Sequence, residues 1–218
     1  MLVAAGRGER LGEDRPKAFV RLGELPLLAE PLRRLDDNDA IDGLVVVAPP
    51  GWEEPAILLA EQLGASKVSA SVPGADTRAG SVSVGLAEVP DDAAVVLVHD
   101  AARPVVPPEV VERLLRALGE GYDGAVPGLP VADTIKRAPD GVVVETLPRA
   151  ELVAVQTPQA FAAQVLRAAF ASATDVAGAT DCSSLVEAAG GRVKVVDGDE
   201  RLQKVTTAAD LERVAAWL

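Results

Sequence analysis

Short apolar runs recur along the chain and alternate with segments whose apolar residues are spaced as on one face of a helix. The run 95–98 is apolar at every position, which is typical of a strand covered on both faces and therefore mainly parallel. Alternation of such strands with helices favours a layered α/β domain with right-handed crossovers. The pattern predicts strands at 2–4, 43–48, 67–70, 94–98, 123–127, 142–147 and 193–196, and helices at 26–36, 52–64, 78–88, 107–119, 158–172, 181–190 and 208–217.

The interval 131–155 departs from this alternation. Its residues predict two extended segments around a turn at Pro139-Asp140-Gly141, which is typical of a β-hairpin. Such a hairpin is either an extra element at the sheet edge or an arm that reaches a partner subunit. The pattern alone favours the edge element.

Composition and charge narrow the function classes. The chain has 218 residues, of which 49% are hydrophobic and 25% charged, as expected for a globular domain. Its apolar runs are too short to span a bilayer and its N-terminus lacks the order of a signal peptide, so we expect a cytoplasmic protein without a membrane partner. A net charge of −12 argues against nucleic-acid binding, which needs a basic face. One Cys and one His exclude an internal disulfide and a Cys/His zinc site, so any metal is expected to be oxygen-bound, as Mg²⁺ is.

A glycine-rich segment follows the first predicted strand, and ligands of open α/β sheets bind beyond the carboxyl ends of strands. Gly6 and Gly8 allow backbone N–H groups to approach phosphate oxygens, and Arg10 and Lys17 add positive charge. The third glycine stands one position late for a dinucleotide fingerprint, and Ala18 replaces the Ser or Thr of a Walker motif. The pattern therefore favours a loop for a nucleoside triphosphate, with a solvated basic surface loop as the alternative.

Two later segments also carry groups of chemical use. Asp100 ends the most apolar strand, where a carboxylate can hold Mg²⁺ or a ribose hydroxyl, and Arg103 can contact a phosphate or lock the loop. His99 is more typical of a structural residue than of a general base. Near Arg78, helix N-terminal amides and Ser81 can bind a base or a phosphate, or simply cap the helix.

Several motifs occur together in one order along almost the whole chain. They are Ala4-Ala5-Gly6-x-Gly8-x-Arg10, Pro16-Lys17, Arg78-x-x-Ser81-Val82, Val98-His99-Asp100-Ala101-Ala102-Arg103-Pro104, Asp133-Thr134-Ile135-Lys136, Thr157-Pro158-Gln159, Thr180-Asp181 and Lys204-Val205-Thr206. With these motifs in this order, the sequence resembles the 2-C-methyl-D-erythritol 4-phosphate cytidylyltransferases of the non-mevalonate isoprenoid pathway. The most specific motifs are the segment around Asp100 and the later Asp-Thr-Ile-Lys and Thr-Pro-Gln segments.

The resemblance implies a single Rossmann-like α/β domain over 1–218, with a protruding β-hairpin arm at about 131–155 that builds a homodimer. It implies transfer of CMP from CTP to 2-C-methyl-D-erythritol 4-phosphate, giving 4-diphosphocytidyl-2-C-methyl-D-erythritol and pyrophosphate by direct in-line attack on the α-phosphorus. The implied cofactor is Mg²⁺, held mainly by CTP phosphates with Asp100 as a candidate ligand. A ribitol 5-phosphate or other polyol-phosphate cytidylyltransferase shares most motifs and remains the alternative.

The resemblance also implies roles for single residues. The candidate catalytic residues are Arg10, Lys17, Arg149 and Lys204. The candidate nucleotide-binding residues are Ala4, Ala5, Gly6, Gly8, Arg10, Lys17, Gly74, Arg78, Ser81, Asp100, Ala101 and Arg103. The candidate acceptor-binding residues are Asp100, Arg103, Thr134, Arg149, Thr157 and Lys204, with Arg149 reaching into the neighbour's site. The chain departs from the family pattern at Gly80, Cys182 and Leu202, and an exposed Cys182 would make the site sensitive to thiol reagents.

Overall fold

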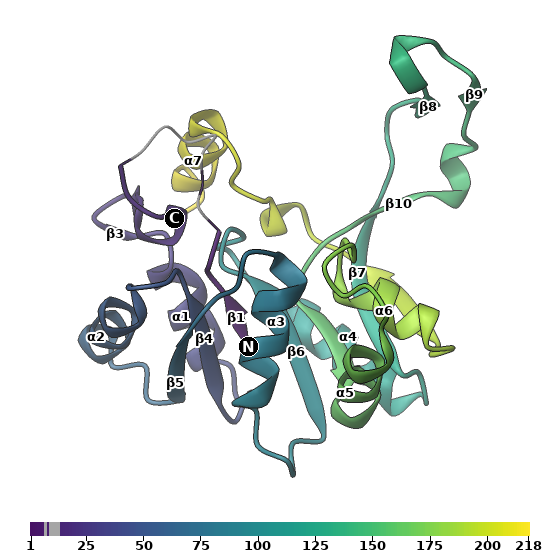
Figure 1. The fold of residues 1–218 in the computed structure, drawn as a ribbon. Helices are drawn as coiled ribbons and strands as arrows, with labels where there is room; N and C mark the ends of the chain where they lie inside the picture. Colours follow the sequence, from purple (N-terminus) through teal and green to yellow (C-terminus); the bar gives the residue numbers. More distant parts are fainter. Residues whose placement is uncertain (7, 9–13) are drawn as a thin grey trace.

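The computed structural model describes residues 1–6, 8 and 14–218 and is built on a mixed, mostly parallel sheet with helices on both faces (Figure 1). The strand order is β10-β7-β11-β6-β1-β4-β5, and β12 pairs with β7. These strands are β1 (Leu2–Val3), β4 (Leu44–Ala48), β5 (Val68–Pro73), β6 (Val95–Asp100), β7 (Gly124–Pro130), β10 (Val153–Val155), β11 (Gln159–Ala162) and β12 (Val193–Asp197). The α-helices are α1 (Ala29–Asp36), α2 (Glu53–Leu63), α3 (Arg78–Ala87), α4 (Pro108–Gly119), α5 (Ala163–Ser172), α6 (Cys182–Ala188) and α7 (Ala208–Ala215). The predicted α/β class is confirmed.

Strand β4 shows why this sequence forms a covered parallel sheet. All five of its residues are buried. Val46 packs in one apolar cluster with Leu32 of α1, whereas Val47 packs in another with Val82 of α3. Because helices cover both faces, the strand has no solvated position, which is what its continuous apolar run predicted.

The C-terminal part of the chain returns to the ends of the central strands. Helix α7 packs through Val214 against Val205 and against Leu27, which follows the small hairpin of β2 (Arg21–Leu22) and β3 (Leu25–Pro26). Figure 1 shows α7 beside β3, above the carboxyl end of β1. This packing places the segment after the short 3-10 helix η5 (Glu200–Leu202) at the carboxyl ends of the central strands. In the part of the chain that the structure describes, no helix is long and apolar enough to cross a membrane.

The helix predicted at 158–172 is wrong in its first part. Residues 159–162 form strand β11, which runs antiparallel to β6 and to β7, and α5 begins only at Ala163. Phe161 is fully buried in the apolar cluster shared with α5 and α6. The alanine-rich sequence of this segment has a high helix propensity. Because the segment fills the gap between β6 and β7, its packing overrides that local propensity.

The arm of residues 131–155 extends away from the sheet (Figure 1). It contains a small hairpin of β8 (Lys136–Arg137) and β9 (Glu145–Thr146), the turn η3 (Pro139–Gly141) at the predicted place, and the 3-10 turn η4 (Arg149–Glu151). Of the strand predicted at 142–147, only β9 forms. The edge-element interpretation holds for β10, which pairs with β7, but not for the hairpin itself.

Candidate active site

A cavity of about 730 Å³ opens where the carboxyl ends of β1, β4, β5 and β6 meet. It is therefore at the edge of the sheet where ligands of α/β proteins bind. Ten of the residues singled out from the sequence line it: Ala4, Ala5, Gly6, Lys17, Gly74, Arg78, Ser81, Asp100, Ala101 and Lys204.

The loop after β1 carries the glycine-rich segment, of which Arg10 lies outside the described residues. Gly8 has φ of +73°, and a Cβ added to it would lie 2.6 Å from Lys17 Cβ. Only glycine allows this close approach to the turn η2 (Lys17–Phe19). Gly8 itself does not line the cavity, but its close approach to Lys17 helps to place Lys17 in the lining.

The loop after β5 is pressed against the loop after β1. A Cβ on Gly74 would lie 2.1 Å from Ala5 Cβ, so no side chain fits there. The Ser81 hydroxyl is buried and accepts the Ala75 N–H at 3.0 Å, so it shapes this loop from inside. Thr77 caps α3 by accepting the Gly80 N–H at 3.0 Å. The predicted helix cap is thus formed by Thr77, and the loop that leads into this cap lines the cavity.

Asp100 joins two cations that come from distant parts of the chain. Its Oδ1 accepts from Arg78 Nε at 2.8 Å, and its Oδ2 accepts from Lys204 Nζ at 2.7 Å. Burial alone would raise the pKa of Asp100, but the charges of Arg78 and Lys204 outweigh burial and hold that pKa well below its usual range. Asp100 is therefore an anion at neutral pH.

His99 is held by its neighbours and lies outside the cavity lining. Its Nε2 is 2.9 Å from the Arg103 carbonyl, which only accepts, so Nε2 carries the proton. Its Nδ1 then accepts from the Thr157 hydroxyl at 3.1 Å, while the same hydroxyl accepts the Asp100 N–H at 3.0 Å. Burial lowers the pKa of His99 to about 4. The structural interpretation of His99 agrees with this geometry.

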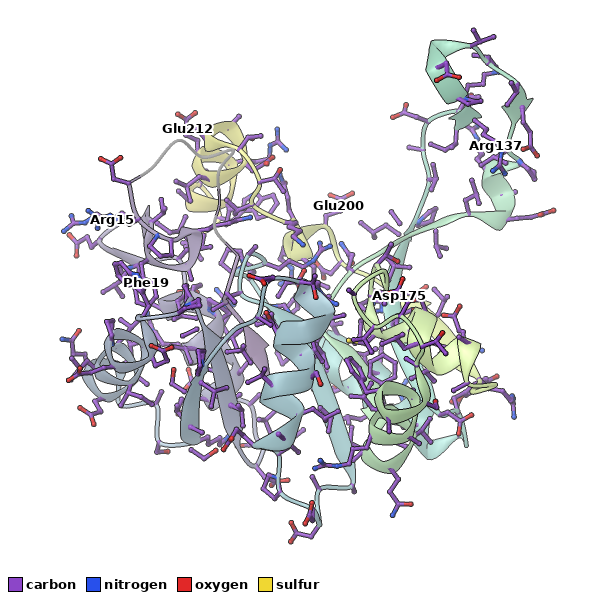
Figure 2. The ribbon with its side chains drawn as sticks, in the orientation of Figure 1. Arg15, Phe19, Arg137, Asp175, Glu200 and Glu212 are labelled. Carbon is purple, nitrogen blue, oxygen red and sulfur yellow. The ribbon has the colours of Figure 1, made fainter. Side chains whose placement is uncertain are left out.

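Four other residues that were predicted to belong to the site do not line the cavity of their own chain. Arg103 donates through Nη1 to the Leu202 carbonyl and does not line the cavity. Thr157 sits behind Asp100 rather than in the cavity. Thr134 and Arg149 are exposed on the arm, where Arg149 donates to the Ala132 carbonyl. In Figure 2, Arg137 marks the far end of this arm, well away from the cavity of the same chain.

The expectation about Cys182 is wrong. Its side chain is only 1% exposed, and burial raises the pKa of its thiol to about 11. Arg78 Nη1 lies 3.8 Å from its Sγ. The preceding residue, Asp181, caps α6 by accepting the Ser184 N–H at 3.0 Å. Cys182 is thus a packing residue beneath Arg78 and not an exposed thiol.

One apolar part of the cavity wall was not predicted from the sequence. Trp52 lines the cavity next to Pro49 and Pro50, and its ring packs on Phe19 with centroids 4.5 Å apart. Phe19 belongs to the same turn as Lys17, so this aromatic pair supports that turn (Figure 2 labels Phe19). A proline pair after an apolar strand was the available signal, but it matches no ligand-binding motif.

Comparison with known proteins gives one family over the whole chain. The family model described as 2-C-methyl-D-erythritol 4-phosphate cytidylyltransferase matches residues 1–218. A protein of that name from Saccharopolyspora erythraea is 47% identical over 222 residues, which cover 100% of this chain and 97% of the relative. A crystal structure of the Thermus thermophilus protein of that name is similar with a TM-score of 0.79 and 32% identity, covering 99% of this chain and 96% of that one. The Francisella tularensis structure has a TM-score of 0.83 at 27% identity, with 100% and 98% covered.

Proposed function

The chain belongs to the 2-C-methyl-D-erythritol 4-phosphate cytidylyltransferase family, and on that premise we propose that the cavity at the ends of β1, β4, β5 and β6 is where it transfers CMP from CTP to its acceptor. The acceptor is 2-C-methyl-D-erythritol 4-phosphate, and the products are the cytidylylated alcohol and pyrophosphate. The matches do not favour the ribitol 5-phosphate alternative.

The nucleotide side of the cavity is formed by the loops after β1 and β5. Ala5 and Gly6 offer backbone N–H groups without side chains that obstruct a ligand, whereas Ala4 lines the cavity with its N–H already donated to the Val47 carbonyl. Lys17 offers a compact positive charge to phosphate oxygens. The contact between Gly74 and Ala5 fixes the spacing of these two loops. Ala101 and Arg78 complete the lining on the side of β6.

The acceptor side is formed around Lys204 and Asp100. The attacking group is a phosphate whose second pKa is about 6, so it is already a nucleophile at neutral pH. No general base is required, which suits a site whose single histidine is buried and neutral. The task of the protein is to align two polyanions and neutralise the charge that spreads over the oxygens in the transition state. Lys17 and Lys204 serve that task from the two sides of the cavity.

Mg²⁺ is proposed as the cofactor, with Asp100 as the candidate protein ligand. When bound, it neutralises triphosphate charge and orients the α-phosphate. Both oxygens of Asp100 already accept from Arg78 and Lys204. Among the described residues, no group of three or more His, Cys, Asp or Glu side chains is placed to hold a metal. These residues therefore fit an ion that is held mainly by the CTP phosphates.

The arm is proposed to build a homodimer in which Arg149 and Thr134 reach the neighbour's acceptor site. Two features support this. Val142, Val143 and Val144 on the arm are 57% to 66% exposed, and such a run favours burial against another chain. Neither Thr134 nor Arg149 lines the cavity of its own chain. The enzyme is further proposed to be cytoplasmic and to bind no nucleic acid, in keeping with its net charge of −12.

The convergence of Arg78 and Lys204 on Asp100 inside a glycine-lined cavity carries this proposal. We test it by measuring pyrophosphate release with Mg²⁺ and CTP, and with methylerythritol 4-phosphate or ribitol 5-phosphate in parallel. Release with the first acceptor alone is expected. Release with ribitol 5-phosphate instead keeps the mechanism but changes the acceptor, and silence with both contradicts the proposed site.

A further inference from the structure

Lys204 depends on the segment 198–205 for its position. The residue lies between η5 and α7, outside regular secondary structure, and its flexible side chain spans to Asp100 at 2.7 Å. A lysine side chain that is fixed in one place loses rotamer freedom, so its backbone must be held firmly if its ammonium is to be prepositioned. Leu202 anchors the middle of the segment, because its side chain is fully buried beside Leu114, and at one end the Val205 N–H donates to the Ala102 carbonyl at 2.7 Å.

Gln156 holds the other end of this segment. It is 5% exposed and comes directly after the return strand of the arm, β10. Its Nε2 donates to the Asp199 carbonyl at 2.8 Å, and its Oε1 accepts the Asp199 N–H at 3.0 Å. The carboxamide therefore pairs with one residue as a neighbouring strand would. Its own N–H donates to the Pro127 carbonyl at 2.7 Å, which anchors Gln156 to β7.

Gly198 leaves room for this pairing. A Cβ added to Gly198 would lie 2.4 Å from Gln156 Oε1 and 3.0 Å from the Gly128 backbone. The segment can thus lie against β7 and the carboxamide only because this position has no side chain. The chain provides a glycine and a buried glutamine that fit each other, 42 residues apart (198 − 156).

The next residue, Thr157, holds the other partner of the ion pair, because its hydroxyl accepts the Asp100 N–H at 3.0 Å. Adjacent residues at the root of the arm therefore fix the two backbone segments that carry Lys204 and Asp100. We propose that Gln156 is a positioning residue for Lys204, and that through Gln156 and Thr157 the root of the arm sets the Lys204–Asp100 geometry. This inference rests on the proposed role of Lys204 in the acceptor site.

The main test is the Gln156→Met variant, which keeps the length of the side chain and loses both hydrogen bonds to Asp199. We expect kcat/KM for the acceptor to fall about 10- to 100-fold, as for a group displaced by about 1 Å, while the Kd for CTP stays close to wild type and the melting temperature falls by only a few degrees because two hydrogen bonds are lost. Gln62→Leu, at an exposed position on α2, is the matched control and keeps full activity. Amide hydrogen exchange of 198–205 is expected to be faster in Gln156→Met and unchanged in the control.

A double-mutant cycle separates this inference from the proposed function. In a Lys204→Ala background, Gln156→Met is expected to cause no further loss, because the group that it positions is gone. If Lys204→Ala is as active as wild type, the role of Lys204 fails and this inference fails with it. If Lys204→Ala is impaired but Gln156→Met is not, or if the two losses multiply, the inference is overturned and the proposed function stands. If Gln156→Met does not fold, Gln156→Glu replaces it, since it keeps the acceptor for the Asp199 N–H and replaces the donor by an oxygen that repels the Asp199 carbonyl.

Discussion

At the scale of single residues, the site is organised around the carboxylate of Asp100, which serves to hold two cations in place rather than to react. Asp100 has both oxygens engaged, and the two cations that bind it are thereby kept inside the cavity before any ligand arrives. Prepositioned charge costs no reorganisation when the transition state forms, and this is where much of the rate enhancement of phosphoryl-transfer enzymes originates.

Lys17→Ala is expected to lose about 10²- to 10³-fold in turnover, the usual effect of removing one prepositioned electrostatic donor. Steady-state pyrophosphate release measures this loss. Because Lys17 belongs to the turn that Phe19 anchors on Trp52, the melting temperature is the control for folding. A rate near wild type would remove Lys17 from the catalytic residues.

His99 makes the stability of the fold depend on pH. Burial lowers its pKa to about 4 from an unfolded value near 6.5, so the unfolded chain binds the proton more readily in this window. The stabilisation is fully present above pH 6.5 and is lost as the pH falls through 4. The free energy of unfolding is expected to drop by about 3 kcal/mol from this residue alone.

Urea unfolding of wild type and of His99→Gln between pH 4 and pH 7 tests this dependence. The wild-type curve is expected to be the steeper of the two, because only the wild type has the buried imidazole. The lowered pKa of Asp100 has the same sign but acts below pH 4, so it does not mask the difference. Identical slopes in the two proteins would show that His99 does not titrate as inferred.

At the scale of elements, the arm is the part of the chain proposed to form the dimer. Its hairpin presents Val142, Val143 and Val144 to solvent at 57% to 66% exposure. Its root is continuous with the residues that hold Asp100 and Lys204. In the proposed dimer, the arm would therefore link assembly to activity.

Val143→Glu is expected to give a monomer and to lose most of the acceptor turnover, because a charge in the buried face of the proposed dimer is costly. Sedimentation velocity measures the assembly, and pyrophosphate release measures the activity. Val195→Glu, which adds the same charge at a 44% exposed position on β12, is the matched control. A dimer that survives Val143→Glu would place the interface elsewhere.

The elements also show what the sequence could predict. The strands at the centre, such as β4, were predictable because a strand covered on both faces leaves a continuous apolar run. Strand β11 was not, since Gln159–Ala162 reads as the start of a helix and only the gap between β6 and β7 makes it a strand.

The same limit applies to the site. Motifs singled out both Asp100 and Lys204, but their pairing over 104 residues depends on packing that no local pattern records. Trp52 was missed for a similar reason, because it belongs to no motif and reaches the cavity only through the position of the loop after β4. Local chemistry was therefore predictable, whereas contacts between distant segments were not.

At the scale of the whole molecule, a protein of net charge −12 binds two anionic substrates. The two facts are compatible because surface charges are screened over about 8 Å at physiological ionic strength. The cavity instead presents Lys17, Arg78 and Lys204. Because its lining brings Lys204 together with residues from the first half of the chain, the cavity exists only in the folded state.

CTP is therefore expected to bind the folded state alone and to raise the melting temperature. At a concentration 100 times its Kd, a ligand adds about 2.7 kcal/mol to stability, which corresponds to a shift of about 5–10 °C for a chain of this size. Differential scanning fluorimetry with CTP and Mg²⁺ measures the shift, and Lys17→Ala is expected to need more CTP for the same shift. No shift at saturating CTP would exclude this cavity as the nucleotide site.

The contact of Gly74 with Ala5 has a consequence for redesign of the enzyme. Because a Cβ at Gly74 would lie only 2.1 Å from Ala5 Cβ, no substitution of Gly74 fits the present spacing of these two loops. Pro49, Pro50 and Trp52 also line the cavity, and Trp52 packs on Phe19 in the turn that carries Lys17. Libraries that aim at a different nucleotide base, and inhibitors that aim to distinguish this enzyme from its relatives, should therefore vary or engage the wall at Pro49 and Pro50 and leave Gly74 and Trp52 untouched.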